Sequence, residues 1–197
     1  MMRAGIGAGM GAGDGLCDDE GLARLVATIG ADAVAGLAEV ERLLVAYPDD
    51  ARLHFLKGSL LVGAKRFVGA HLALSRAVEL APDFDLARFQ LGFFELTSGE
   101  AAAAVRTWAP LEQSLAEDHW MRLFVTGLRA LAEDRYAACR EALTAGIAAN
   151  RDNAPLNADM ALIVAECEKL DGAGEGAAAA DDPVSATSLL LGSARRH

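Results

Sequence analysis

The sequence predicts an all-α protein, a solenoid of about eight or nine helices arranged as antiparallel pairs. Two observations lead to this prediction. Hydrophobic residues make up 53% of the 197 residues but aromatic residues only 6%, so the apolar content is mostly Ala, Leu and Val. Such a composition disfavours an aromatic-rich β-sandwich. In addition, residues of matching size recur every 34 or 35 residues, which is typical of stacked two-helix repeats.

The period appears in sets of equivalent positions in successive repeats, which we call columns. Two columns hold small residues, which let paired helices approach closely: Gly58, Gly92, Gly127 and Ala70, Ala104, Cys139. A third column lies four positions after the second, on the same helical face, and holds larger side chains: Leu74, Trp108, Leu143. The same spacing relates Phe67, Ala101 and Tyr136. Agreement of several independent columns indicates true repeats.

The elements follow from these columns in order. Residues 18–48 form a degenerate hairpin, because Arg24 stands where glycine is expected although Gly36 and Val40 continue the other two columns. Full repeats follow at about 51–84, 85–118 and 120–153. Residues 154–170 form a capping helix, since their apolar residues are spaced by three or four. Asp and Asn residues in the turns between pairs are suitable N-caps.

The two ends have a different composition. Residues 1–17 are rich in Gly and Ala, and residues 171–197 are small and polar apart from Leu189–Leu191. We expect a disordered N-terminus and a flexible C-terminal tail, since neither has enough apolar surface to pack alone. An alternative for the tail is docking of its leucines on a groove of this chain or of a neighbour.

The repeats resemble those of the tetratricopeptide repeat (TPR) family, whose 34-residue unit is a pair of antiparallel helices. The resemblance rests on Leu91-Gly92 followed by Ala104-x₃-Trp108, and on Gly58 followed by Ala70-x₃-Leu74 and Pro82. It implies a TPR-type superhelical domain over residues 18–170. It also implies a concave groove, built from the first helix of each pair, that binds a partner protein. The matching groove positions are Phe55, Leu56, Ser59, Leu86, Phe89, Gln90, Phe93, Met121, Phe124, Val125 and Leu128.

The chemistry of these positions predicts the kind of partner. None carries a cationic side chain, so the basic clamp with which some family members bind acidic C-terminal tails is absent. A carboxylate would lose hydration there without a charged partner. We therefore expect a non-catalytic adaptor or chaperone that binds a hydrophobic or amphipathic segment of a protein partner. Small acidic bacterial chaperones of secretion machinery offer one setting by resemblance. The alternatives are a self-assembling scaffold whose groove is filled by another copy or by its own tail, phenylalanines that simply pack within each unit, and an enzyme or regulatory subunit without a recognisable motif.

Charge and cysteine content limit other functions. The net charge of −10 repels phosphate backbones, which makes nucleic acid a poor partner. Three widely spaced cysteines do not form a disulfide framework and fit a reducing, cytoplasmic setting. No run of apolar residues is long enough for a transmembrane helix. Neither a metal nor a cofactor is expected: the four histidines are scattered, and Cys139 and Cys167 have the pattern of small buried hydrophobes.

Overall fold

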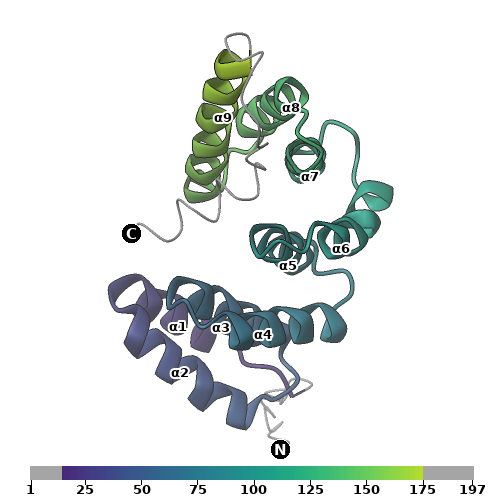
Figure 1. Ribbon diagram of the computed structural model, residues 1–197. Helices are drawn as coiled ribbons and strands as arrows, with labels where there is room; N and C mark the ends of the chain where they lie inside the picture. Colours follow the sequence, from purple (N-terminus) through teal and green to yellow (C-terminus); the bar gives the residue numbers. More distant parts are fainter. Residues whose placement is uncertain (1–14, 175–197) are drawn as a thin grey trace, which may run out of the picture. The chain divides into compact units, whose positions relative to one another are not determined.

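The computed structural model describes residues 15–174, and over these residues it contains nine α-helices and no strand (Figure 1). The helices are α1 (Asp19–Ala31), α2 (Ala33–Ala46), α3 (Ala51–Gly63), α4 (Phe67–Leu80), α5 (Asp85–Thr97), α6 (Ala101–Ser114), α7 (Trp120–Ala132), α8 (Tyr136–Ala149) and α9 (Ala154–Gly174). The predicted all-α fold of antiparallel helix pairs is confirmed. Residues 1–14 and 175–197, with the leucines at 189–191, lie outside the described residues, so the expectations for them stay predictions.

The helices divide into two units, one ending at Asp83 and the other beginning at Phe84. Unit 1 contains α1–α4 and unit 2 contains α5–α9. The sequence pattern predicts one domain over 18–170, and the division falls inside the turn that closes its first full repeat. Each unit has a hydrophobic cluster of its own, centred on Leu25, Val40 and Leu53 in unit 1 and on Trp108 and Phe124 in unit 2.

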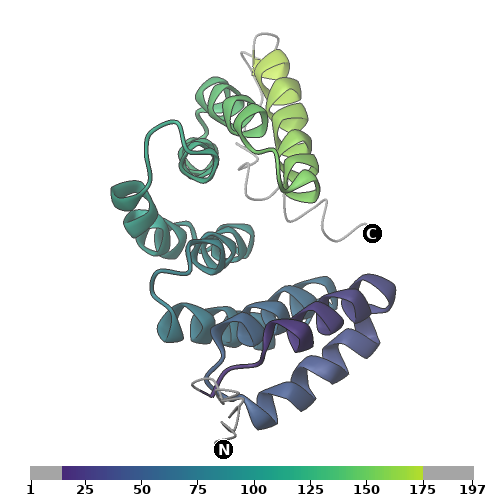
Figure 2. The same ribbon diagram turned by 180° about the vertical axis from the view of Figure 1, so that it is seen from behind.

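Unit 1 is a run of helices in which each packs against the next: α1 on α2, α2 on α3 and α3 on α4 (Figures 1 and 2). Unit 2 repeats the arrangement with α5–α6 and α7–α8, and α9 lies along α8. The capping helix is longer than expected, because it continues from 170 to Gly174. The predicted N-terminal boundary also shifts, since Cys17 is buried and belongs to the core of unit 1 rather than to a disordered terminus.

The small-residue columns have the packing role that the sequence indicates. A Cβ at Gly58 would lie 2.6 Å from Leu74 Cγ, and one at Gly127 would lie 2.7 Å from Leu143 Cγ. A Cβ at Gly92 would overlap the indole of Trp108. The large side chain on the second helix of each pair therefore occupies the space that glycine leaves on the first, and the close approach explains why these positions are invariant among the three repeats.

A column that the sequence does not reveal lies in the turns within the pairs. Lys65, Gly99 and Asp134 have φ values of 57°, 88° and 55° and are spaced by 34 and 35 residues. The residue after each donates its backbone N–H to a carbonyl five positions back, as Arg66 does to Leu61 at 2.9 Å. This is the Schellman motif that ends a helix with one left-handed residue. All three full pairs therefore turn through the same geometry, although only one has glycine at that position.

Candidate interaction surfaces

The eleven predicted groove residues fall into two groups by burial. Five belong to the interior of unit 2 and are at most 4% exposed: Phe89, Met121, Phe124, Val125 and Leu128. Six are half-buried: Phe55, Leu56 and Ser59 on α3, and Leu86, Gln90 and Phe93 on α5. The expectation that the first group faces a partner is corrected by this burial, because a side chain inside the unit offers no surface to another protein.

The interior position of the two buried phenylalanines follows from an aromatic cluster. The ring of Phe89 lies about 6.3–6.4 Å, between centroids, from the rings of Phe93, Trp108, Trp120 and Phe124. The indole N–H of Trp108 donates to the backbone carbonyl of Phe89 at 3.0 Å, so its polar atom is satisfied inside the core. Aromatic contacts of this kind stabilise a core beyond their area. The cluster therefore joins α5, α6 and α7 from within.

A glycine on α8 explains how Phe124 enters this core. A Cβ at Gly146 would lie 2.5 Å from Cδ1 of Phe124, so only glycine leaves room for the ring. Trp120, the first residue of α7, then packs edge-on against Phe124 with ring centroids 5.6 Å apart. The place of Phe124 in the repeat gives no sign of this, but a glycine opposite an aromatic residue on the next helix is a signal that could have indicated it.

The half-buried residues of α3 lead to an apolar pocket within unit 1. Its volume is about 510 Å³, and it lies between the α1–α2 turn and the C-terminal half of α3. It is lined by Ile29, Ala33, Val34, Leu37, Leu56, Ser59, Leu60, Gly63 and Ala64. Only Leu56 and Ser59 of these are predicted groove residues. Ile29, Ala33, Val34 and Leu37 were missed because the predicted groove does not include the turn of the first hairpin, and Leu60, Gly63 and Ala64 because they are not among the groove positions of the repeat.

The pocket wall is almost entirely hydrocarbon. Among the described residues that line it none is charged, and its one hydroxyl, on Ser59, donates to the carbonyl of Phe55 at 3.0 Å. Val34 stands at its edge and is 80% exposed. An ion would lose its hydration in such a pocket without gaining a partner, whereas an apolar side chain would exchange water contacts for hydrocarbon contacts. The wall thus suits an aliphatic or aromatic group.

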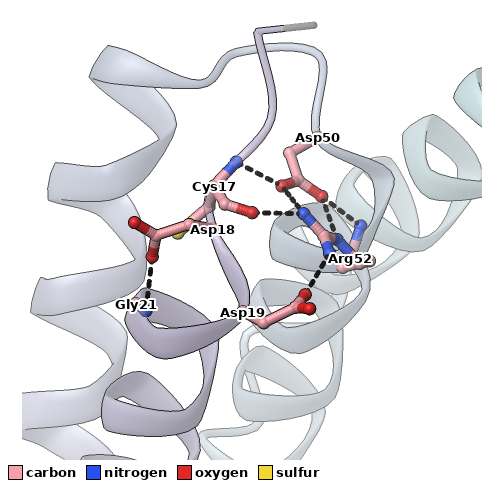
Figure 3. A network of polar contacts seen from close by, with 6 residues as sticks. All are labelled: Cys17, Asp18, Asp19, Gly21, Asp50 and Arg52. Carbon is pink, nitrogen blue, oxygen red and sulfur yellow. Dashed lines mark hydrogen bonds and ion pairs between the residues drawn. The ribbon is translucent and has the colours of Figure 1, made fainter. Parts of the chain in front are cut away.

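A polar network at the N-terminal ends of α1 and α3 fixes the geometry of unit 1 (Figure 3). The guanidinium of Arg52 donates to both carboxylate oxygens of Asp50, at 3.0 and 2.8 Å, and to the backbone carbonyl of Cys17 at 2.6 Å. The carboxylate also accepts the N–H of Cys17 at 3.0 Å, and Asp19 lies 3.6 Å from Arg52. These contacts hold the start of α1 against the start of α3.

Asp50 is 1% exposed, and burial of a carboxylate normally raises its pKa. In this case the hydrogen bonds from Arg52 and from the backbone N–H groups of Cys17 and Arg52 outweigh the burial, so the pKa of Asp50 is lowered from its usual value. The carboxylate is also the N-cap of α3, as expected for an aspartate in a turn between pairs. The network is structural, because every group in it bonds to another part of unit 1.

The histidines and cysteines of the described residues do not gather into a metal site. His54 Nε2 lies 2.8 Å from the carbonyl of Pro48, and His119 Nδ1 accepts the N–H of Met121 as the N-cap of α7. Between residues 15 and 174, no three His, Cys, Asp or Glu side chains lie where they could hold a metal ion. Cys139 and Cys167 are in contact inside unit 2.

Comparison with protein-family models, with curated proteins and with solved structures found no match to this chain. The functional argument therefore rests on the chain's own residues. None of the helices within the described part combines the length and the hydropathy that crossing a bilayer requires.

Proposed function

We propose that the protein is a non-catalytic protein–protein interaction module that receives an apolar side chain of a partner in the pocket of unit 1. The observation that supports this is the pocket itself: an open space of about 510 Å³ whose described lining residues carry no charge. Apolar pockets of about this volume are the usual form of binding sites on folded proteins. The TPR-like repeat pattern, whose family binds partner proteins, favours the same function.

The partner segment is an amphipathic helix with apolar anchors. The pocket takes one or two large aliphatic or aromatic side chains, and helical segments present such groups on one face at spacings of three and four. The acidic surface of the chain, with its net charge of −10, favours polar or basic residues on the segment's other face. A bacterial cytoplasmic adaptor or chaperone for such segments is the setting that we propose.

The proposal is tested by adding charge at the edge of the pocket. Val34→Asp places a carboxylate beside the apolar wall, and its position in the first turn of α2 suits an acid because the helix dipole favours it there. Binding of a fluorescently labelled, leucine-faced amphipathic peptide is measured by anisotropy. We expect saturable binding by the natural sequence and a loss of roughly tenfold or more in affinity for this variant.

Val45→Asp is the control for an added carboxylate on the same helix, at its last turn, where the helix dipole disfavours the charge and folding is therefore checked separately. Val45 is 85% exposed on the same helix and does not line the pocket, so binding should stay within about twofold of the natural protein, since exposed substitutions outside a contact are usually small in effect. A peptide of the same composition without helical periodicity should bind weakly. Equal affinity for the Val34 and Val45 variants, with both folded by circular dichroism, would rule out the pocket as the binding site.

A further inference from the structure

Two thiols face each other in the interior of unit 2. Cys139 lies on α8 and Cys167 on α9, their Sγ atoms are 3.6 Å apart, and both side chains are fully buried. Cys139 stands in the small-residue column whose other members are Ala70 and Ala104. A small hydrophobe suffices for packing there, so the sulfur is not required by the fold, and its contact with a second sulfur is the feature to explain.

The helix that carries Cys167 is bound to the rest of unit 2 chiefly through α8 (Figure 1). Its contact face consists of Met160, Ile163 and Cys167, and an ion pair of 3.1 Å between Arg140 and Asp171 joins the same two helices near the sulfurs. A helix with neighbours on one side opens more readily than one enclosed on several sides. Opening of α9 would give both sulfurs access to water and to small oxidants.

We propose that Cys139 and Cys167 are an oxidative modification site, at which hydrogen peroxide forms a disulfide that fastens α9 to α8. The thiolate of one cysteine attacks a peroxide oxygen and becomes a sulfenic acid, while the departing hydroxide takes up a proton to form water. The second thiol then attacks the sulfenic sulfur and releases its proton, and the hydroxide that leaves combines with it as a second water. Two thiols and one peroxide thus give one disulfide and two waters.

The geometry favours this product over further oxidation. Closing the bond requires the sulfurs to approach from 3.6 Å to about 2.05 Å, a change that side-chain rotation and a small helix shift can supply. In the closed protein the hydrogen bond with Cys167 and burial raise the pKa of the Cys139 thiol, whereas the same hydrogen bond lowers the pKa of Cys167. Cys167 is therefore the thiol that attacks the peroxide first, and burial of both sulfurs keeps the reaction slow until α9 opens. Once one sulfur is oxidised, the nearest nucleophile to it is the other sulfur.

The third cysteine serves as an internal comparison. Cys17 is buried in unit 1, where it packs with Leu25 and Leu43, and it has no neighbouring thiol among the described residues. Burial raises its pKa as well. If burial alone governed oxidation, all three cysteines would behave alike. The proposal instead predicts that intramolecular disulfide formation is confined to the pair in unit 2.

The test treats the folded, fully reduced full-length protein with a small excess of hydrogen peroxide. Remaining thiols are alkylated, and the protein is digested with trypsin under non-reducing conditions. We expect a crosslinked species that joins residues 136–140 to residues 152–169, and a fall in free thiols from three to one. The thermal midpoint of the oxidised monomer should rise by several degrees, and a thiol reductant should reverse both changes.

Cys139→Ala is the matched variant, because alanine occupies the equivalent positions 70 and 104 and the variant is expected to fold. Its thermal midpoint should not respond to peroxide. The proposal is overturned if the natural protein yields no such crosslink, if the two cysteines pass to sulfinic or sulfonic acids instead, or if the crosslink forms only after unfolding in denaturant. A midpoint rise that persists in Cys139→Ala would also contradict it.

Discussion

A buried aspartate determines how unit 1 begins. Asp50 caps α3, binds Arg52 through both carboxylate oxygens and receives the N–H of Cys17, so one side chain joins a helix start, a turn and a segment 33 residues earlier. An exposed ion pair between the same residue types contributes little, because water competes for both charges. Here the carboxylate is hidden and each of its bonds is made to a fixed partner.

Asp50→Ala should therefore lower the free energy of unfolding of unit 1 by about 2–3 kcal/mol, because it removes hydrogen bonds to a charged group and leaves the N–H of Cys17 without an acceptor. The folded-state pKa of Asp50 is below its usual value, so its contribution is present above about pH 4 and is lost as the pH falls through the folded-state pKa. Urea titrations should therefore show a smaller difference in unfolding free energy between Asp50→Ala and the natural protein at pH 3 than at pH 7.

Asp49→Ala is the control for this measurement. Asp49 is the preceding residue and its side chain is 70% exposed, paired with Arg76 at the surface. Its removal should change the unfolding free energy by no more than about 0.5 kcal/mol. Equal losses for the two variants at pH 7 would mean that the buried network contributes no more than a surface pair.

At the scale of the helix, each pair is held by the fit between a glycine and a large side chain. Helix α3 contains two glycines with opposite surroundings: Gly58 faces Leu74 on α4, whereas a Cβ at Gly63 would meet nothing within 4 Å. Both have ordinary helical backbone conformations. The helix therefore contains its own comparison between a glycine required by packing and one that is not.

We expect Gly58→Ala to destabilise the protein by about 1–3 kcal/mol, because the new methyl group would press on Leu74 and on the backbone of α4. Gly63→Ala should be neutral or stabilising by about 0.5–1 kcal/mol, because it reduces the entropy of the unfolded chain without a clash. Chemical denaturation followed by circular dichroism measures both. A Gly58 variant as stable as the Gly63 variant would contradict the packing role of the column.

At the scale of the whole molecule, the separate hydrophobic clusters predict that the two units unfold separately. Both tryptophans, Trp108 and Trp120, belong to unit 2, which also holds the larger cluster. Tryptophan fluorescence therefore reports on unit 2 alone, whereas circular dichroism reports on the helices of both units. We expect the ellipticity to begin its fall at lower urea than the fluorescence change. Coincident curves from the two probes would indicate a single cooperative transition instead.

Much of this architecture could be predicted from the sequence, since the spacing of Gly58, Gly92 and Gly127 locates the helix pairs and their contact faces. The division after Asp83 could not, because the period continues across it. The candidate surface was predicted only in part. Position in a repeat suggests which way Phe89 faces, but its actual burial depends on Trp120 and Trp108 from neighbouring helices.

The pocket escaped prediction for a related reason. It arises where small residues, such as Ala33 and Gly63, leave space between helices. The repeat pattern shows where large side chains recur, so it does not predict where a space is left unfilled. The left-handed turn residues Lys65 and Asp134 were missed similarly, because neither is the glycine that usually indicates this conformation.

The polar network of Cys17, Asp50 and Arg52 has a practical consequence for handling the protein. It lies at the N-terminal ends of α1 and α3, whereas the pocket is lined by the end of α1, the start of α2 and the C-terminal half of α3. At a rise of about 1.5 Å per residue, Ile29 lies about 15 Å along α1 from Asp19, and the lining of α3 begins at Leu56, about 6 Å beyond Arg52. A biotin group attached at position 16, where Leu16 is 45% exposed beside the network, would be held at the start of α1, and immobilisation on a sensor surface by that route should leave the pocket open to ligand.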